Sequence, residues 1–373
     1  MTDRNQLKIV TIIGARPQFI KAATISRAIA AHNRSGTSPA VVEILIHTGQ
    51  HYDDGMSAIF FRELEIPEPK YNLNVGSGPH GQQTGQMLAT IEETLLAEQP
   101  DWVLIYGDTN STLAGALAAA KLHIPIAHVE AGLRSFNRRM PEEINRIVAD
   151  RLATLLFCPS QTSVENLIAE GIVKGVSIVG DVMADALEFA VAKVSDNSDI
   201  LNRLGLQPQS YLLATVHRAE NTGDSQRFRT IMATLSELSE REPVILPLHP
   251  RTKKILEHTL NLELPSLRLI DPVGYFDIIA LEKSARLLLT DSGGMQKEAY
   301  WLKVPCITLR DETEWVETVE SGWNILAGAN QKKIINATQN FTQPMAHPDL
   351  YGDGHAAEKI IISLLEENAL KNE

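Results

Sequence analysis

Carboxylates follow two apolar runs in the first half of the chain. Asp108 comes just after the run 102–106, and Glu130 just after the run 124–129. An open parallel sheet binds its ligands outside the carboxyl ends of its strands, so both acids are expected at one sheet edge. Glu142 follows at the start of a Pro-led helical segment. Crowded carboxylates raise one another's pKa, so one can act as an acid while another stays a base. The sequence therefore predicts a proton-transfer site. For a lone acid at such a point, a turn or cap residue is the alternative interpretation.

A glycine-led segment, residues 14–21 (GARPQFIK), joins the first apolar run to the first predicted helix. Pro17 suits the first turn of a helix, and a helix N-terminus attracts anions. Arg16 and Lys21 add positive charge beside that terminus, which suits a diphosphate. The segment is neither a GxGxxG nor a Walker loop, so two solvated cations around a helix start are the alternative interpretation.

A second glycine-containing segment, residues 290–299 (TDSGGMQKEA), repeats this arrangement in the second half of the chain. Ser292, Gly293 and Gly294 would present backbone N–H groups and a hydroxyl to a phosphate at the start of the next helix. Glu298 lies about a turn and a half into that helix and could accept hydrogen bonds from ribose hydroxyls. A serine N-cap followed by a structural glycine turn is the alternative.

Two histidines come directly after predicted strands of the second half. His217 follows the run 211–216, and His249 follows the run 244–248. Both positions favour a ligand-facing or catalytic role, although a histidine also packs neutrally in a core. Neither has HxH or HExxH spacing, so no metal site is predicted.

Apolar runs alternate with helical patterns throughout, which is typical of doubly wound α/β domains. The pattern restarts near residue 182, so we expect one Rossmann-like domain over residues 1–182 and a second over 183–357. The last helix, 358–373, is expected to join the first domain, the alternative being that it caps the second. The ligand site is expected in the cleft between the domains. The predicted strands are 8–13, 41–47, 102–106, 124–129, 155–158, 176–179, 211–216, 244–248, 267–270, 285–290 and 306–309.

Bulk composition narrows the class of protein. The 373 residues carry a net charge of −12, which argues against a nucleic-acid binder because that affinity comes from Lys and Arg. Cys158 and Cys306 lie far apart in the sequence and suggest two buried thiols in a reducing compartment. No apolar run approaches the roughly 20 residues that a membrane span needs, so a cytoplasmic protein is expected.

In combination, these segments resemble the non-hydrolysing UDP-N-acetylglucosamine 2-epimerase family. The resemblance implies a GT-B fold whose C-terminal domain holds most of the UDP, a UDP-sugar substrate and a homodimer. It also implies inversion at C2 of a 2-acetamido sugar without a nicotinamide, metal or other cofactor, through loss of UDP and a 2-acetamidoglucal. The matching segments run in order along the chain: GARPQFIK, HTGQH, YGDTNSTLAGALAA, HVEAGLRS, MPEEINR, HRAEN, DPVGY, TDSGGMQKEA and YGDGHA.

The resemblance also implies roles for individual residues. Three acids, Asp108, Glu130 and Glu142, would handle the C2 proton and hold the sugar. His217 would assist the leaving diphosphate. Gln50 and His51 resemble part of a second, activating UDP-GlcNAc site. The remaining substrate-binding residues would be Arg16 and Lys21 at the diphosphate or sugar, His249, Ser292, Gly293 and Gly294 at the phosphates, and Glu298 at the ribose.

Some positions depart from the family pattern. Trp315 stands where an arginine often contacts the ligand, Gln18 stands where Glu is commoner, and Val273 replaces a polar residue. These departures are similar to the branch acting on UDP-2,3-diacetamido-2,3-dideoxyglucuronate. The UDP-binding segments would also suit a GT-B glycosyltransferase, whose acceptor site the acid cluster fits poorly, a hydrolysing relative, or a non-catalytic UDP-sugar sensor.

Overall fold

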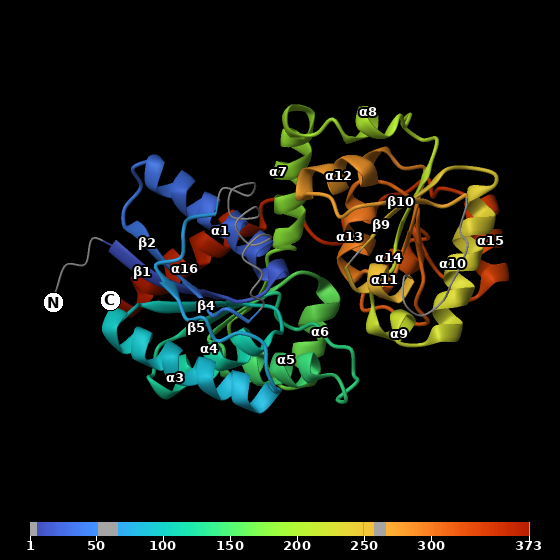
Figure 1. The fold of residues 1–373 in the computed structure, drawn as a ribbon. Coiled ribbons are helices and arrows are strands. Elements are labelled where there is room, and N and C mark those ends of the chain that lie inside the picture. Colours follow the sequence, from blue (N-terminus) through green and yellow to red (C-terminus); the bar gives the residue numbers. More distant parts are fainter. Residues whose placement is uncertain (1–5, 51–65, 249, 257–265, 373) are drawn as a thin grey trace. The chain divides into compact units, whose positions relative to one another are not determined.

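The computed structural model describes residues 6–50, 66–248, 250–256 and 266–372 (Figure 1). Contacts divide the chain into two compact units, residues 1–188 with 351–373 and residues 189–350. The division falls within one continuous helix, α7 (Val182–Asn197), and the boundary expected near residue 182 coincides with the start of that helix.

A seven-stranded parallel sheet forms the centre of the first unit, in the order β3-β2-β1-β4-β5-β6-β7. The order reverses between β1 and β4, which is where such sheets open a crevice at the carboxyl ends of their strands. The strands are β1 (Gln6–Ile13), β2 (Ala40–His47), β3 (Tyr71–Asn72), β4 (Trp102–Tyr106), β5 (Ile126–Val129), β6 (Leu155–Cys158) and β7 (Val176–Ile178).

Helices follow the strands of this sheet in turn. Thr109 caps α4 by accepting a hydrogen bond from the Thr112 N–H, as expected for a threonine N-cap. A Cβ at Gly115 would lie 2.8 Å from Ile12 Cδ1, so glycine lets α4 approach the sheet closely. The helices are α1 (Arg16–Arg34), α3 (His80–Glu98), α4 (Asn110–Lys121), α5 (Pro141–Leu152), α6 (Gln161–Ala169), α7 and α16 (Ala356–Asn372).

The last helix, α16, belongs to the first unit, where it packs beside α1. Asp185 of α7 accepts hydrogen bonds from the N–H groups of Ala356 and Ala357, at 3.2 and 2.8 Å. These bonds satisfy donors that the first turn of a helix leaves unpaired. The chain therefore returns to the first unit after completing the second.

The second unit has a six-stranded parallel sheet in the order β10-β9-β8-β11-β12-β13, with the reversal between β8 and β11. Its strands are β8 (Leu212–Thr215), β9 (Val244–Pro247), β10 (Arg268–Ile270), β11 (Leu287–Thr290), β12 (Cys306–Thr308) and β13 (Asn324–Leu326). Its helices are α8 (Ile200–Leu204), α9 (Ala219–Thr222), α10 (Ser225–Ser239), α11 (Pro250–Ile255), α12 (Tyr275–Ser284), α13 (Gly293–Trp301), α14 (Val316–Glu320) and α15 (Gln331–Asn340).

Both sheets confirm the predicted Rossmann-like α/β class. Cys158 and Cys306 are free and buried, as expected. Within the part of the chain that the structure describes, no helix combines the length and apolar character that crossing a membrane requires.

Candidate functional site

The turns after β4 and β5 carry two of the predicted acids. Asp108 follows Gly107, whose φ is 58°, and Glu130 itself has a φ of 71°. Left-handed backbone is strained in a residue with a side chain, and such strain gathers at functional sites. The Gly107 N–H donates to the Val129 carbonyl at 3.0 Å, so the two turns are held side by side.

Lys21 of α1 reaches this edge and pairs directly with Glu130. Its Nζ donates to Glu130 Oε2, and the two side chains are 9% and 11% exposed. Burial would lower the pKa of Lys21, but the charge and hydrogen bond of Glu130, with Asp181 and Asp108, raise it above the ordinary value. A Cβ at Gly107 would lie 3.1 Å from Glu130 Oε2 and 3.4 Å from Lys21 Nζ, so only glycine leaves the pair undisturbed.

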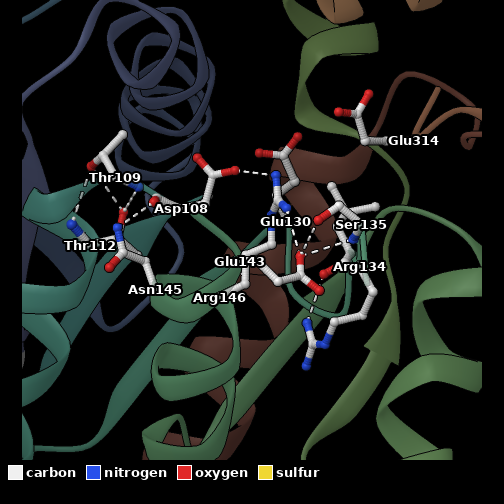
Figure 2. A network of polar contacts seen from close by, with 12 residues as sticks. Asp108, Thr109, Thr112, Glu130, Arg134, Ser135, Glu143, Asn145, Arg146 and Glu314 are labelled. Atoms are coloured by element: carbon white, nitrogen blue, oxygen red, sulfur yellow. Dashed lines mark hydrogen bonds and ion pairs between the residues drawn. The ribbon is translucent and has the colours of Figure 1, made fainter. Parts of the chain in front are cut away.

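Arg146 of α5 bridges Asp108 and Glu143 (Figure 2). Its Nη2 donates to Asp108 Oδ2, and its Nη1 donates to Glu143 Oε2 at 3.1 Å. Burial raises the pKa of Asp108, and the charges of Glu130 and Glu142 add to this, while Arg146 and Lys21 oppose it. The balance lies above the ordinary aspartate value, which suits a group that exchanges a proton.

The adjacent acids Glu142 and Glu143 have different environments. Glu143 is buried and accepts hydrogen bonds of 2.9 Å from the Ser135 N–H, the Ser135 hydroxyl and the Phe136 N–H. Burial alone would raise the pKa of Glu143, but these bonds and the bond from Arg146 lower it below the ordinary value. Glu143 therefore fixes the loop before α5. Glu142, the predicted site residue, is exposed in the first turn of α5.

The amide of Gln18 joins the start of α1 to the end of β4. Its Oε1 accepts from the N–H groups of Gly14 and Ala15, at 2.8 and 3.0 Å. Its Nε2 donates to the Tyr106 carbonyl at 2.9 Å and to Thr112 Oγ1 at 3.1 Å. A carboxylate could not make the last two bonds because it has no hydrogen to donate. Gln18, which stands where the family more often has glutamate, therefore holds the start of α1 against the end of β4.

Gln50 lies against the first turn of α4. Its Oε1 accepts from the Ser111 N–H at 3.1 Å and from the Ser111 hydroxyl at 2.7 Å. His51, its partner in the expected activating site, lies outside the described residues, as does His249. Arg16 is the first residue of α1, and its side chain is also outside the described part.

In the second unit, Asp291 holds the turn that carries His217. Asp291 is fully buried and accepts from the N–H groups of His217 and Arg218, at 3.0 Å each, and from Asn221 Nδ2 at 3.1 Å. His217 Nδ1 lies 3.6 Å from Asp291 Oδ1. The sequence pattern did not single out Asp291 as a site residue. Its place directly after β11 is the signal that could have found it.

Polar groups lie around the N-terminus of α13, where the sequence predicts phosphate contacts from residues 292–294. Ser292 caps the helix by accepting from the Met295 N–H at 3.4 Å. A Cβ at Gly293 would lie 3.3 Å from Trp315 Nε1 and 3.4 Å from Arg218 Nη2. An indole N–H and a guanidinium therefore stand beside a helix N-terminus, where an anion is favoured.

Two further residues complete this region. The indole ring of Trp315 has Lys297 Nζ 3.8 Å from its centroid, so it also takes part in a cation–π contact. Glu298, the predicted ribose ligand, is buried on α13. Its charge, after burial itself, helps to raise the pKa of fully buried Glu282 well above the ordinary value.

The structure thus brings Lys21, Asp108 and Glu130 together in the first unit, and His217, Ser292 and Gly293 around β8 and β11 in the second. Among the described residues, no group of His, Cys, Asp and Glu side chains could hold a metal ion.

A family model described as UDP-N-acetylglucosamine 2-epimerase matches residues 34–365. The chain belongs to this family of enzymes. It is 54% identical over 361 residues to a UDP-N-acetylglucosamine 2-epimerase homolog of Methanococcus maripaludis, covering 95% of this chain and 98% of that one. It is 50% identical, with the same coverage, to the UDP-2,3-diacetamido-2,3-dideoxy-D-glucuronate 2-epimerase of Pseudomonas aeruginosa.

Solved structures agree with this membership. The crystal structure of Methanocaldococcus jannaschii UDP-GlcNAc 2-epimerase in complex with UDP-GlcNAc and UDP matches with a TM-score of 0.85 and 44% identity. The match covers 97% of this chain and 99% of that one. The two parallel sheets of the present protein and its match to this solved structure confirm the predicted GT-B-like fold.

Proposed function

We propose that the protein inverts C2 of a UDP-2-acetamido sugar, as in conversion of UDP-GlcNAc to UDP-ManNAc. The observation that carries the proposal is the acidic edge of the first sheet, where Lys21 pairs with Glu130 and Arg146 pairs with Asp108. Two carboxylates held by separate cations can differ in protonation, which is what proton removal and proton return require. Family membership supports the same chemistry.

The proposed reaction has two stages. A carboxylate takes the C2 proton while the C1–O bond breaks, the electron pair leaves with UDP, and a C1–C2 double bond remains in a 2-acetamidoglucal. UDP then returns to C1 as an acid delivers a proton to the other face of C2. The C2 proton is weakly acidic, so a carboxylate base suffices only when C1–O cleavage is well advanced and the charge of UDP is neutralised.

The residues divide between these tasks. Asp108, Glu130 and Glu142 handle the C2 proton and hold the sugar. His217 assists departure of the diphosphate. The other substrate-binding residues are Arg16 and Lys21 near the diphosphate or sugar, His249, Ser292, Gly293 and Gly294 at the phosphates, and Glu298 at the ribose.

The sugar has a second candidate, UDP-2,3-diacetamido-2,3-dideoxyglucuronate. The 50% identity to the Pseudomonas aeruginosa enzyme of that name favours it, while the Methanocaldococcus jannaschii structure supports UDP-GlcNAc. With either sugar, the product would be a precursor for a surface polysaccharide. A homodimer in the cytoplasm and an activating site at Gln50 and His51 belong to the same proposal.

Incubation of each candidate sugar nucleotide in deuterated water tests the proposal. We expect deuterium at C2 and interconversion of the two C2 epimers with one substrate or both. Absence of deuterium at C2 with both substrates would overturn it. Release of UDP only with an added acceptor would indicate a glycosyltransferase, and free N-acetylmannosamine with UDP would indicate hydrolysis. UDP binding without any turnover would indicate a sensor.

A further inference from the structure

His128 of β5 is fully buried, and both of its ring nitrogens lie close to oxygen atoms. Nδ1 is 2.7 Å from Asp150 Oδ1, and Nε2 is 2.8 Å from the carbonyl oxygen of Gly107. A carbonyl oxygen can only accept, so Nε2 carries the hydrogen of the second bond. The ring therefore donates to the turn that precedes Asp108.

Asp150 and Arg134 orient the ring from the other side. Arg134 Nη1 donates to Asp150 Oδ2 at 2.7 Å, and the Gly132 N–H donates to the same oxygen at 3.2 Å. Burial would raise the pKa of Asp150, but His128 and Arg134 together lower it below the ordinary value. Arg134 is held in turn by two bonds to Glu170, of 2.7 and 2.9 Å. Asp150 Oδ1 thus lies within hydrogen-bond distance of His128 Nδ1, and the ring cannot rotate without losing its contacts on both sides.

Gly107 is consequently tied to β5 through both of the peptide groups that flank it. Its N–H donates to the Val129 carbonyl at 3.0 Å, and its carbonyl accepts from His128. The residue after Gly107 is Asp108, and the residue after Val129 is Glu130. A Cβ at Gly107 would lie 3.1 Å from Glu130 Oε2, so this peptide also lies against the second acid. A shift of the Gly107 peptide would change the separation of the two carboxylates.

We infer that His128 is a positioning residue for proton transfer: its Nε2 hydrogen bond to the Gly107 carbonyl holds the Asp108 turn against the Glu130 turn. The inference rests on the proposed function of these two acids. His128 itself touches no substrate, because it is buried beneath the edge. A misplacement of about 1 Å at a reacting group can lower a rate about 100-fold, so the bond matters to turnover more than to binding.

Three variants test the inference in the full-length protein. His128→Phe removes both ring bonds and keeps a planar ring. His128→Gln removes the ring but retains an amide N–H that can donate to the Gly107 carbonyl. Glu170→Gln is the matched control, since it weakens the far end of the same network and contacts neither His128 nor Gly107. For each variant we would measure kcat, KM, the Kd for UDP, and Tm.

We expect His128→Phe to lower kcat about 100-fold, with KM and the UDP Kd changed less than about threefold. His128→Gln should recover part of that loss, and Glu170→Gln should keep kcat within about threefold of the wild type at a comparable Tm. A wild-type kcat in folded His128→Phe would overturn the inference. So would an equal loss of kcat in Glu170→Gln. If His128→Phe does not fold, His128→Leu, which also lacks a hydrogen-bond donor, takes its place in the comparison with His128→Gln and Glu170→Gln.

Failure of the proposed function would give a different result from failure of this inference. If the proposed function is wrong, the wild-type protein incorporates no deuterium at C2. If only this inference is wrong, exchange stays intact in both the wild type and the His128 variants.

Discussion

Lys21 and Glu130 form a buried ion pair although 109 positions separate them in the chain. The lysine comes from the first helix and the glutamate from the turn after the fifth strand. A buried carboxylate is costly unless a cation and hydrogen bonds compensate for lost water, so Lys21 offsets the cost of burying Glu130 at the sheet edge. The pair gives the clearest stability test of the acidic edge.

Replacement of Lys21 by methionine should destabilise the protein and abolish most turnover. Removing one partner of a buried pair costs about 3–5 kcal/mol, because the other charge stays buried and unpaired. Chemical denaturation and turnover would measure both effects. Lys70→Met is the control, since Lys70 pairs with Glu98 from an exposed position and should change stability much less. Equal effects of the two substitutions would contradict the role given to Lys21.

Replacement of Arg146 by glutamine should shift the pH dependence of turnover. Burial already raises the pKa of Asp108, and Arg146 is the strongest influence that lowers it. Without that charge the pKa rises further, so the limb of the kcat/KM profile that reports Asp108 moves to higher pH. Arg139→Gln, an exposed change in the preceding loop, should leave the profile in place. An unmoved profile in Arg146→Gln would separate Asp108 from the chemistry.

A methyl group at Gly293 should weaken UDP binding. In Gly293→Ala the new carbon would lie 3.3 Å from Trp315 Nε1 and 3.4 Å from Arg218 Nη2, so these donors must move. We expect a UDP Kd about tenfold higher, or about 1.4 kcal/mol, by calorimetry. Gly294→Ala is the matched change one residue on, where the nearest atom is Ser292 Oγ at 3.8 Å. A larger effect at Gly294 than at Gly293 would argue against donors converging on Gly293.

Glu282 should make stability depend on pH. Its pKa is raised well above the ordinary 4.5, first by burial and then by the charge of Glu298. Neither of its carboxyl oxygens has a hydrogen-bond partner among the described residues. The folded protein keeps a proton that the unfolded chain releases above pH 4.5, so this contribution is full below that pH and falls as the pH rises.

Glu282→Gln removes the ionisation and keeps the shape. Its Tm should be close to that of the wild type at pH 5 and higher than the wild type at pH 8. Glu240→Gln, an exposed change at the end of α10, should show no such trend. A constant difference between Glu282→Gln and the wild type across this range would mean that Glu282 ionises normally.

The sequence predicts the sheets well where a strand is a long apolar run. Strand β4 has the bounds expected from the sequence, because Trp102–Tyr106 is apolar throughout and buried. Two edge strands were missed. β3 has two residues and β13 has three, so neither produces a run or an alternation that stands out. Their pairing is set by neighbouring strands rather than by local propensity.

The positions of Asp108 and Glu130 could also be predicted, since both directly follow strands. Their partners could not. Arg146 lies 38 positions from Asp108 in the chain, and contacts of that kind depend on how helices pack. Nor could the sequence distinguish the neighbours Glu142 and Glu143. Only the fold shows that Glu143 is buried against Ser135, in the loop before α5, while Glu142 faces solvent.

The left-handed backbone of Glu130 has an energetic consequence for the folded protein. A residue with a side chain destabilises the folded state by about 1–2 kcal/mol in that conformation relative to glycine, whether or not a substrate is bound. A glutamate at a φ of 71° therefore carries a backbone cost, which its buried ion pair with Lys21 offsets.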